Sequence, residues 1–199
     1  MKDNMITDNK NINSGKSAKE NFRSRGLILI NTGNGKGKST AAIGCALRSA
    51  GHEQKVLILQ FIKGTMHTGE LKSIEYLKPF IEIFQTGKGF IKYKEGKPFI
   101  TEEDKKDARL AYEFSIKKIE NGNYDLIVLD EIINLLNFGL ISFEELKKII
   151  FSRPEGSSII LTGRNAPLEL IELADTVTEM KEIKHAYNKG MNAKKGIEF

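Results

Sequence analysis

A glycine-rich stretch, TGNGKGKST at residues 32–40, has the residue types that bind phosphate groups. Its glycines can take backbone conformations closed to other residues, which lets successive N–H groups converge on phosphate oxygens. Lys38 adds a positive charge, and the hydroxyl of Ser39 can ligate Mg2+. An apolar run precedes the stretch and a helical pattern follows it, so the phosphates would meet the positive end of a helix dipole. This order favours a nucleotide-binding loop over an ordinary glycine-rich turn, with the residues Gly33, Asn34, Gly35, Lys36, Gly37, Lys38 and Ser39.

The loop is shorter than usual. Its outer glycines, Gly33 and Gly37, have three residues between them, where the common phosphate loop has four. Thr32 occupies the position of the common first glycine. A shorter loop wraps the phosphates differently, so hydrolysis at the terminal phosphate does not follow from the loop alone.

Two acids, Asp130 and Glu131, close the apolar run LIVLDE at residues 126–131. Carboxylates at the carboxyl end of a strand beside a phosphate loop can hold Mg2+ directly or through water. The alternative is an Asp-Glu pair that only starts a helix. Because the acids follow an apolar strand in a chain with a phosphate loop, the metal site is favoured.

Two arginines are further candidates. Arg164 follows the apolar run that ends in Leu161-Thr162-Gly163, so it is expected at the same edge of the sheet, where it could contact a phosphate chain. A plain surface arginine is the alternative. Arg48, on the helix after the loop, is the weaker candidate because many helix arginines only face solvent.

Histidine and cysteine point to no metal site. The three histidines, at 52, 67 and 185, are far apart in the sequence and lack metal-ligand spacing. The single cysteine, Cys45, excludes an internal disulfide framework and a Cys-rich zinc site. It falls in a stretch that is typical of a buried helix, so we expect it in the core.

The elements that must position these residues follow an α/β pattern. Short apolar runs alternate with amphipathic stretches, and most runs are apolar on both faces, which is typical of a doubly wound, mostly parallel sheet covered on both sides. The expected strands are 27–31, 56–61, 81–85, 126–129, 158–161 and 176–178. The expected helices are 39–50, 102–120 capped by Thr101, and one from the Ser142 and Glu145 capping box to Phe151.

The chain is expected to form one domain, at residues 26–199, behind a flexible arm at residues 1–25 that is rich in Asn, Ser and Lys. Residues 63–76, 86–100 and 181–199 are expected to be irregular. In α/β sheets such segments near strand ends usually build the ligand site. No run approaches the length of a membrane span, and the start lacks the apolar core of a signal peptide, which predicts a cytoplasmic protein.

The net charge of +5 and the pI of about 9.1 are compatible with nucleic-acid binding. Such a site would interleave basic and aromatic residues. The most basic stretch, residues 88–97, holds only Phe90 and Tyr93 among its lysines. A solvated loop is therefore favoured over a nucleic-acid site.

The sequence resembles the bacterial ATP:corrinoid adenosyltransferases, which make adenosylcobalamin, from about residue 26 to residue 199. The short phosphate loop is itself part of that family's pattern. The matching segments are TGNGKGKSTAAIG (32–44), ALRSAGH (46–52), QFIKG (60–64) with Gly69-Glu70, VLDE (128–131), LTGR (161–164), LADTVTEM (173–180) and KHAYNKGMNAKKGIEF (184–199). A generic phosphate-loop protein would share only the loop and the acidic strand end.

The resemblance implies a phosphate-loop fold of the RecA-like type and a particular reaction. A Co(I) corrinoid attacks the 5′ carbon of ATP, a cobalt-carbon bond forms, and triphosphate leaves. It implies that residues 34–40, Thr40 included, bind the triphosphate, with Ser39 and Glu131 as partners of Mg2+. Lys38 and Mg2+ would stabilise the leaving oxygen, and Arg48 and Arg164 are further nucleotide contacts.

The resemblance also implies a second task, the removal of the lower axial ligand from Co(II), so that a flavoprotein can reduce the metal. Two aromatics in a Gly-Phe-Thr-Trp segment do this in the family. The corresponding stretch here is Gly89-Phe90-Ile91-Lys92, which keeps the phenylalanine as Phe90 and has lysine in place of tryptophan. Family members are homodimers whose N-terminal segment can fold over the corrinoid, which gives the arm a role.

Two other functions remain open on the residues alone. A phosphate-loop NTPase or kinase would use Glu131 to position water or a hydroxyl group, and it would release phosphate and ADP. An ATP-gated nucleic-acid binder would show binding to single strands that falls steeply with salt.

Overall fold

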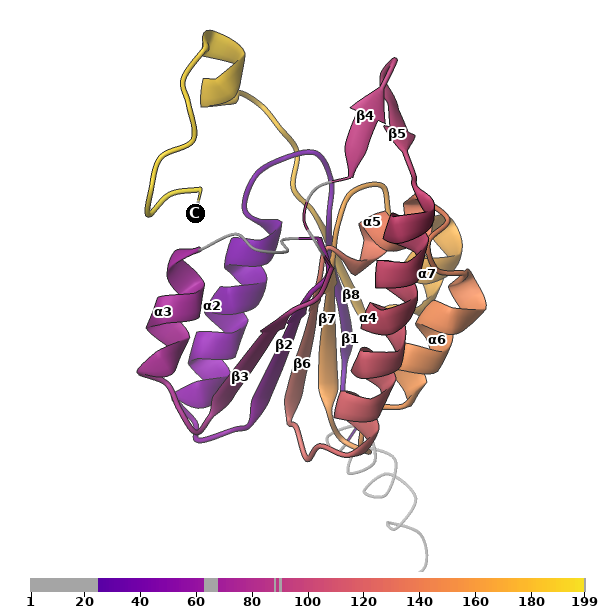
Figure 1. Ribbon diagram of the computed structural model, residues 1–199. Coiled ribbons are helices and arrows are strands. Elements are labelled where there is room, and N and C mark those ends of the chain that lie inside the picture. The colour runs from indigo at the N-terminus through magenta and orange to yellow at the C-terminus, as the bar shows by residue number, and fades with distance from the viewer. Residues whose placement is uncertain (1–24, 63–67, 88, 90, 199) are drawn as a thin grey trace, which may run out of the picture.

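The computed structural model describes residues 25–62, 68–87, 89 and 91–198. The arm predicted at residues 1–25 lies outside these residues except for Arg25, and so does Phe90. A single six-stranded sheet forms the centre of the described chain (Figure 1), in the order β3-β2-β6-β7-β1-β8. Its strands are β1 (Ile28–Thr32), β2 (Val56–Gln60), β3 (Ile81–Gln85), β6 (Leu126–Asp130), β7 (Ser158–Thr162) and β8 (Thr176–Glu179).

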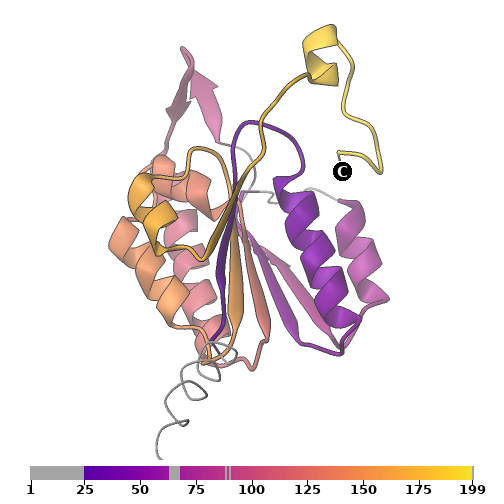
Figure 2. The ribbon, with the colours of Figure 1, turned by 180° about the vertical axis from the view of Figure 1, so that it is seen from behind.

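Every pairing in this sheet is parallel, which confirms the predicted α/β class. Helices cover both faces (Figures 1 and 2). On one side lie α2 (Lys38–Ala50) and α3 (Gly69–Glu75). On the other lie α4 (Glu102–Glu120), α5 (Ile132–Asn137), α6 (Phe143–Phe151) and α7 (Leu168–Leu173).

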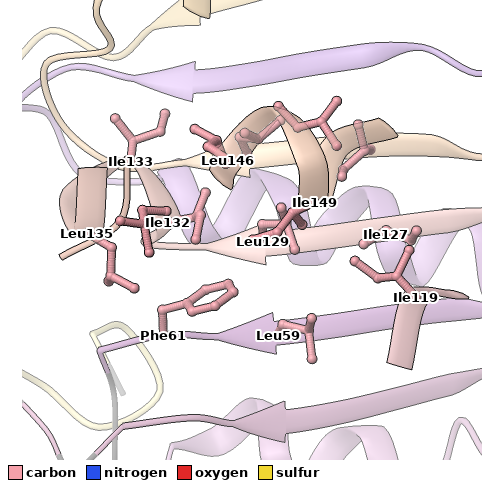
Figure 3. Close-up of a cluster of buried hydrophobic side chains, with 14 of the residues drawn as sticks. Leu59, Phe61, Ile119, Ile127, Leu129, Ile132, Ile133, Leu135, Leu146 and Ile149 are labelled. Atoms are coloured by element: carbon pink, nitrogen blue, oxygen red, sulfur yellow. The ribbon is translucent and has the colours of Figure 1, made fainter. Parts of the chain in front are cut away.

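The strands β2 and β6 are buried on both faces, because their residues are apolar at every position but the last. In β2, Leu57 and Leu59 belong to the core under α4 to α7, whereas Val56 and Ile58 belong to the core under α2 and α3. The residues of β6 divide between the two cores in the same way. Alternate residues therefore face opposite sides of the sheet, as expected for a strand. Figure 3 shows the larger core, in which Leu59, Leu129 and Ile149 are fully buried.

Local sequence signals set two of the helix starts. Thr101 accepts a hydrogen bond from the backbone N–H of Asp104, whose carboxylate accepts one from the backbone N–H of Thr101. Ser142 and Glu145 form the same reciprocal pair at the start of α6. The predicted Thr101 cap and the predicted capping box of Ser142 and Glu145 are confirmed, and α4 has the predicted bounds.

Several elements depart from the expected pattern. The stretch 63–76, expected to be irregular, contains α3, and the stretch 86–100 contains an antiparallel hairpin of β4 (Lys92–Lys94) and β5 (Lys97–Phe99). The tail contains the short 3-10 helix η1 (Ala186–Lys189). These elements have three to seven residues, too few for a clear hydrophobic period.

Cys45, which we expected in the core, is only partly buried. It lies at the border of the core under α2 and α3, on the flank of a helix whose buried apolar residues are alanines.

Candidate active site

The glycine-rich loop joins β1 to α2 at the carboxyl edge of the sheet. Gly33 and Gly37 have φ angles of 98° and 111°, in the region that glycine adopts without strain. Gly37 is also the N-cap of α2, where no side chain caps the helix. The first N–H groups of α2 therefore remain available to an anion, as the sequence predicts.

Close packing is a second reason for glycine in this loop. The N–H of Gly35 donates to the carbonyl oxygen of Met180, 2.6 Å away. A Cβ atom at Gly33 or Gly35 would lie 2.5 or 2.6 Å from that same oxygen, too close for any side chain. The chain after β8 therefore passes directly against the loop.

Lys38 is buried, with only 8% of its surface exposed, and its ammonium donates to the carbonyl oxygen of Gly35 at 2.7 Å. Burial lowers the pKa of Lys38, the Glu131 and Asp130 carboxylates oppose this, and the positive charge of Arg164 adds to it. The fold thus gathers two cations and two anions around the loop. Lys38, Glu131 and Arg164 are three of the predicted site residues, and they come from three separate segments.

A row of polar residues crosses the sheet beside this group, at the last positions of neighbouring strands. The Gln60 amide donates to Asp130 at 3.2 Å and accepts from Gln85 at 3.2 Å. The Thr162 hydroxyl donates to the other Asp130 oxygen at 2.7 Å. Asp130 is only 1% exposed and holds both carboxylate oxygens in hydrogen bonds, so this row fixes it rigidly.

Glu131 follows Asp130 with a φ angle of 67°, in the left-handed region that is costly for a residue with a side chain. Its N–H donates to the Thr162 hydroxyl at 2.9 Å, and its carboxylate accepts a short hydrogen bond from the Asn134 amide. The backbone turn directs the chain from β6 into α5, and Asn134 fixes the carboxylate. A strained residue held by two neighbours is typical of a functional position.

The turn after β7 positions Arg164. Gly163 lies so close to α5 that a Cβ atom there would be 2.6 Å from the Cβ of Ile133. The backbone N–H of Arg164 donates to the side-chain amide oxygen Oδ1 of Asn134 at 2.9 Å, and the backbone carbonyl oxygen of Arg164 accepts from the side-chain amide of Asn137 at 2.7 Å. Asn134 thus joins the backbone of Arg164 to the carboxylate of Glu131.

Of the other predicted nucleotide contacts, four lie at the phosphate loop and one does not. Ser39 and Thr40 are the second and third residues of α2, at the phosphate loop, and Asn34 and Lys36 are exposed on the loop itself. Arg48 lies in the last turn of α2, at the far end from the loop. Ten residues of helix separate it from Lys38, about 15 Å at 1.5 Å per residue. The described chain does not bring Arg48 to the phosphate loop.

The oxygen donors at this edge fit a magnesium ion. Mg2+ takes one or two carboxylates together with substrate phosphates and water. Glu131 and Asp130 supply carboxylates and Ser39 a hydroxyl at the helix start. Among the described residues, no group of three or more His, Cys, Asp or Glu could hold a metal by itself. A magnesium ion here would therefore depend on the phosphates of the nucleotide.

A cavity of about 230 Å3 lies beside the hairpin of β4 and β5, between the ends of β2 and β3 and the first turns of α4. Apolar side chains such as Phe61 and Ala108 line it, together with Lys92 and Asp104. Gly89 and Ile91, the neighbours of Phe90, also line it. The predicted Phe90 side chain itself lies outside the described residues.

Sequence reasoning missed four residues of this edge, which are Gln60, Asp130 as the buried anchor, Thr162 and Asn134. The signal for three of them was present, because the apolar strands VLILQ, LIVLD and SIILT each end in a polar residue. A polar residue at the end of a buried strand needs a partner, and the neighbouring strand ends supply it. Asn134 carried no comparable signal.

The chain is similar over most of its length to known proteins of one family. The family model described as ATP:corrinoid adenosyltransferase BtuR/CobO/CobP matches residues 24–199. The chain is 35% identical to the corrinoid adenosyltransferase of Escherichia coli (strain K12) over 175 residues, 88% of this chain and 86% of that one. It is 36% identical to that of Pseudomonas aeruginosa over 178 residues, 88% and 84% of the two chains.

The relative from Sinorhizobium sp is 39% identical over 179 residues, 88% of this chain and 81% of that one. A solved structure, the KaiC-like protein PH0186 from Pyrococcus horikoshii OT3, superimposes with a TM-score of 0.50 at 17% identity, over 81% of this chain and 76% of that one. That likeness concerns the fold alone. No helix among the described residues has the length and apolar character to cross a membrane. The family match and the relatives together show that the chain belongs to the ATP:corrinoid adenosyltransferase family.

Proposed function

We propose that this chain transfers the 5′-deoxyadenosyl group of ATP to the Co(I) centre of a corrinoid and releases triphosphate, in the synthesis or salvage of adenosylcobalamin. One observation carries the proposal beyond the family match. The buried ammonium of Lys38 lies where the charges of Glu131, Asp130 and Arg164 all act on it, beside a loop with open helix N–H groups. Such an arrangement suits a triphosphate that leaves as one unit.

The reaction breaks the bond between the 5′ carbon and its oxygen. The electron pair of Co(I) forms the cobalt-carbon bond, and the electron pair of the broken bond stays on the triphosphate oxygen. Negative charge develops on that oxygen in the transition state. Lys38 and the uncapped N–H groups at the start of α2 are fixed in place before the reaction, so they stabilise this charge without reorganising.

Mg2+ would be held by Ser39 and Glu131 together with the phosphates, and Asp130 would hold a water molecule of that ion. When bound, the ion supplies positive charge to the leaving triphosphate. Arg164 adds a second protein cation at the phosphates. Arg48 is not included in this site, because it lies at the other end of α2.

No side chain of the protein is the nucleophile in this reaction, because the corrinoid supplies the attacking electron pair. The protein orients the 5′ carbon toward the cobalt and keeps the triphosphate fixed. We assign Phe90 to the removal of the lower axial ligand, because its sequence neighbours Gly89 and Ile91 line the cavity beside the hairpin. A homodimer, a cytoplasmic location and a flavoprotein reductant complete the proposal.

A product assay tests the proposed reaction. The protein is mixed with ATP, Mg2+ and chemically reduced Co(I) cobalamin, and the light-sensitive cobalt-carbon chromophore is followed together with triphosphate release. Equal amounts of both products are expected. Phosphate and ADP without a new chromophore would instead identify a hydrolase.

A further inference from the structure

The segment after β8 returns to the phosphate loop at both of its ends. Directly after the strand, Met180 donates its N–H to the Thr32 carbonyl at 2.8 Å and accepts from the N–H of Gly35 at 2.6 Å. At the other end, the carbonyl oxygen of Ile197 accepts from the ammonium of Lys36 at 2.6 Å. Between these points the chain rises above the sheet edge, forms η1 and comes back toward the start of α2 (Figures 1 and 2). We call residues 181–198 the C-terminal strap.

The strap is strongly basic. It holds five lysines against two glutamates, an excess of three positive charges. The lysines are Lys181, Lys184, Lys189, Lys194 and Lys195, and the glutamates are Glu182 and Glu198. Both glutamates already accept hydrogen bonds inside the strap, from the Asn188 amide and from the backbone N–H of Lys194. The positive excess therefore faces solvent beside a loop built for anions.

The strap also exposes apolar side chains. Ile183 is 86% exposed, Tyr187 73% and Ile197 63%. The strap has no buried residue, and among the described residues its hydrogen bonds, apart from the one to Lys36, lie within the strap itself. A segment held by so few contacts can move at little cost in free energy.

We infer that the C-terminal strap closes over the bound triphosphate and forms the outer wall of its site. The inference rests on the proposed function, since it takes the triphosphate to lie at the loop. The ammonium of Lys36 has three N–H donors, and the Ile197 carbonyl uses one of them. Lys36 can thus bind a phosphate oxygen and keep the strap at the same time. The negative charge of the triphosphate then attracts the lysines of the strap.

Closure would exclude water from the triphosphate and strengthen every charge interaction in the site. It would also make release of the product depend on opening of the strap. The strap lysines would therefore raise the affinity for triphosphate and slow its release.

A single tryptophan can report this closure, because the chain has none of its own. The variant Tyr187→Trp places it on the strap, and Phe151→Trp, at the end of α6, is the control with a similarly exposed side chain. Inorganic tripolyphosphate with Mg2+ is titrated into each variant. For the strap variant we expect a blue shift of the emission and at least twofold weaker quenching by acrylamide, and no change for the control. Stronger quenching, or unchanged emission while tripolyphosphate binds, would overturn the inference.

A charge variant tests the same closure by affinity. Lys194→Gln with Lys195→Gln removes two strap charges, and Lys105→Gln with Lys106→Gln removes an adjacent exposed pair on α4. The strap variant should bind tripolyphosphate about three- to tenfold more weakly by calorimetry, and the α4 variant should bind as the unaltered chain does. Equal affinities in both variants would count against a strap that contacts the ligand. If the unaltered chain binds no tripolyphosphate, the phosphate-loop site itself fails, which distinguishes that failure from failure of the strap alone.

Discussion

At the scale of single residues, the burial of the charged Lys38 side chain lowers the stability of the fold, although the proposed function needs that charge. Burial lowers its pKa, so the folded chain holds the charged form less well than the unfolded chain does. Between the lowered pKa and the ordinary value of 10.5 the unfolded chain binds more protons, and stability rises with pH there. Below that window the cost of the buried charge is fully present.

Lys38→Met should therefore keep or raise the free energy of unfolding at pH 7, by up to about 1 kcal/mol, while it abolishes triphosphate binding. Urea unfolding and calorimetry with tripolyphosphate measure the two effects. A loss of several kcal/mol would show instead that Lys38 is held favourably by Glu131 and Asp130.

Glu131 is the second residue of the proposed site that costs stability, because its backbone has a strained φ angle. Glycine adopts its φ angle of 67° without cost, so Glu131→Gly should not lower stability and could raise it by about 1 kcal/mol. Its turnover should nevertheless fall by at least a hundredfold, because the variant lacks the carboxylate that we propose as a ligand of Mg2+. Glu131→Gln is the matched control, which keeps the side chain length and loses only the charge. Wild-type turnover in the glutamine variant, measured against Mg2+ concentration, would remove Glu131 from the metal site.

At the scale of elements, substitution by alanine should have different effects at Gly35, in the phosphate loop, and at Gly44, inside α2. Gly35→Ala places a Cβ against the Met180 carbonyl, so it should separate the loop from the chain after β8 and lower ATP affinity by at least tenfold. Gly44→Ala lies inside α2 with open space around the new methyl group. It should raise stability by about 0.5–1 kcal/mol and leave ATP affinity unchanged. Equal ATP affinity in both variants would contradict the close contact between loop and strap.

The sequence predicted the elements whose signals are local. The predicted strand bounds lie within one residue of those observed, because most of the strands are short runs of apolar residues. The starts of α4 and α6 were predicted from the Thr101 cap and from the capping box of Ser142 and Glu145. The hairpin of β4 and β5 was not predicted, because each of its strands has only three residues and all of them are exposed. The helix α3 was not predicted either, because only Ile74 of its seven residues is buried and the segment shows no clear helical pattern. Their positions depend on tertiary contacts rather than on local preference.

At the scale of the whole molecule, the site depends on the order of the strands. The polar ends of β2, β6 and β7 form one row only because these strands are neighbours in the sheet, although residues 61–125 separate the first two along the chain. The phosphate loop and the acidic strand end could be predicted, since each is a continuous motif. The polar end of β2 indicates that Gln60 needs a partner. Which residue it pairs with, and the contact between Met180 and the loop, could not be predicted, because they join segments that are distant in sequence.

Ligand binding should stabilise the whole fold by an amount that grows with the logarithm of the ligand concentration above its Kd. Tripolyphosphate with Mg2+ at about 100 times its Kd should add about 2.7 kcal/mol to the free energy of unfolding. The midpoint of thermal unfolding should rise in the unaltered chain and stay constant in Lys38→Met. An equal rise in both proteins would place the ligand away from the phosphate loop.

The central claim is that the 5′ carbon of ATP, and not a phosphate, is the atom transferred. ATP labelled with 13C at the 5′ carbon is therefore mixed with the protein, Mg2+ and chemically reduced Co(I) cobalamin, and the products are followed by 13C and 31P spectra. The account predicts a label bound to cobalt and one intact triphosphate for each label transferred. A label that remains in ADP, with free phosphate beside it, would contradict the account and identify an enzyme that acts at the terminal phosphate.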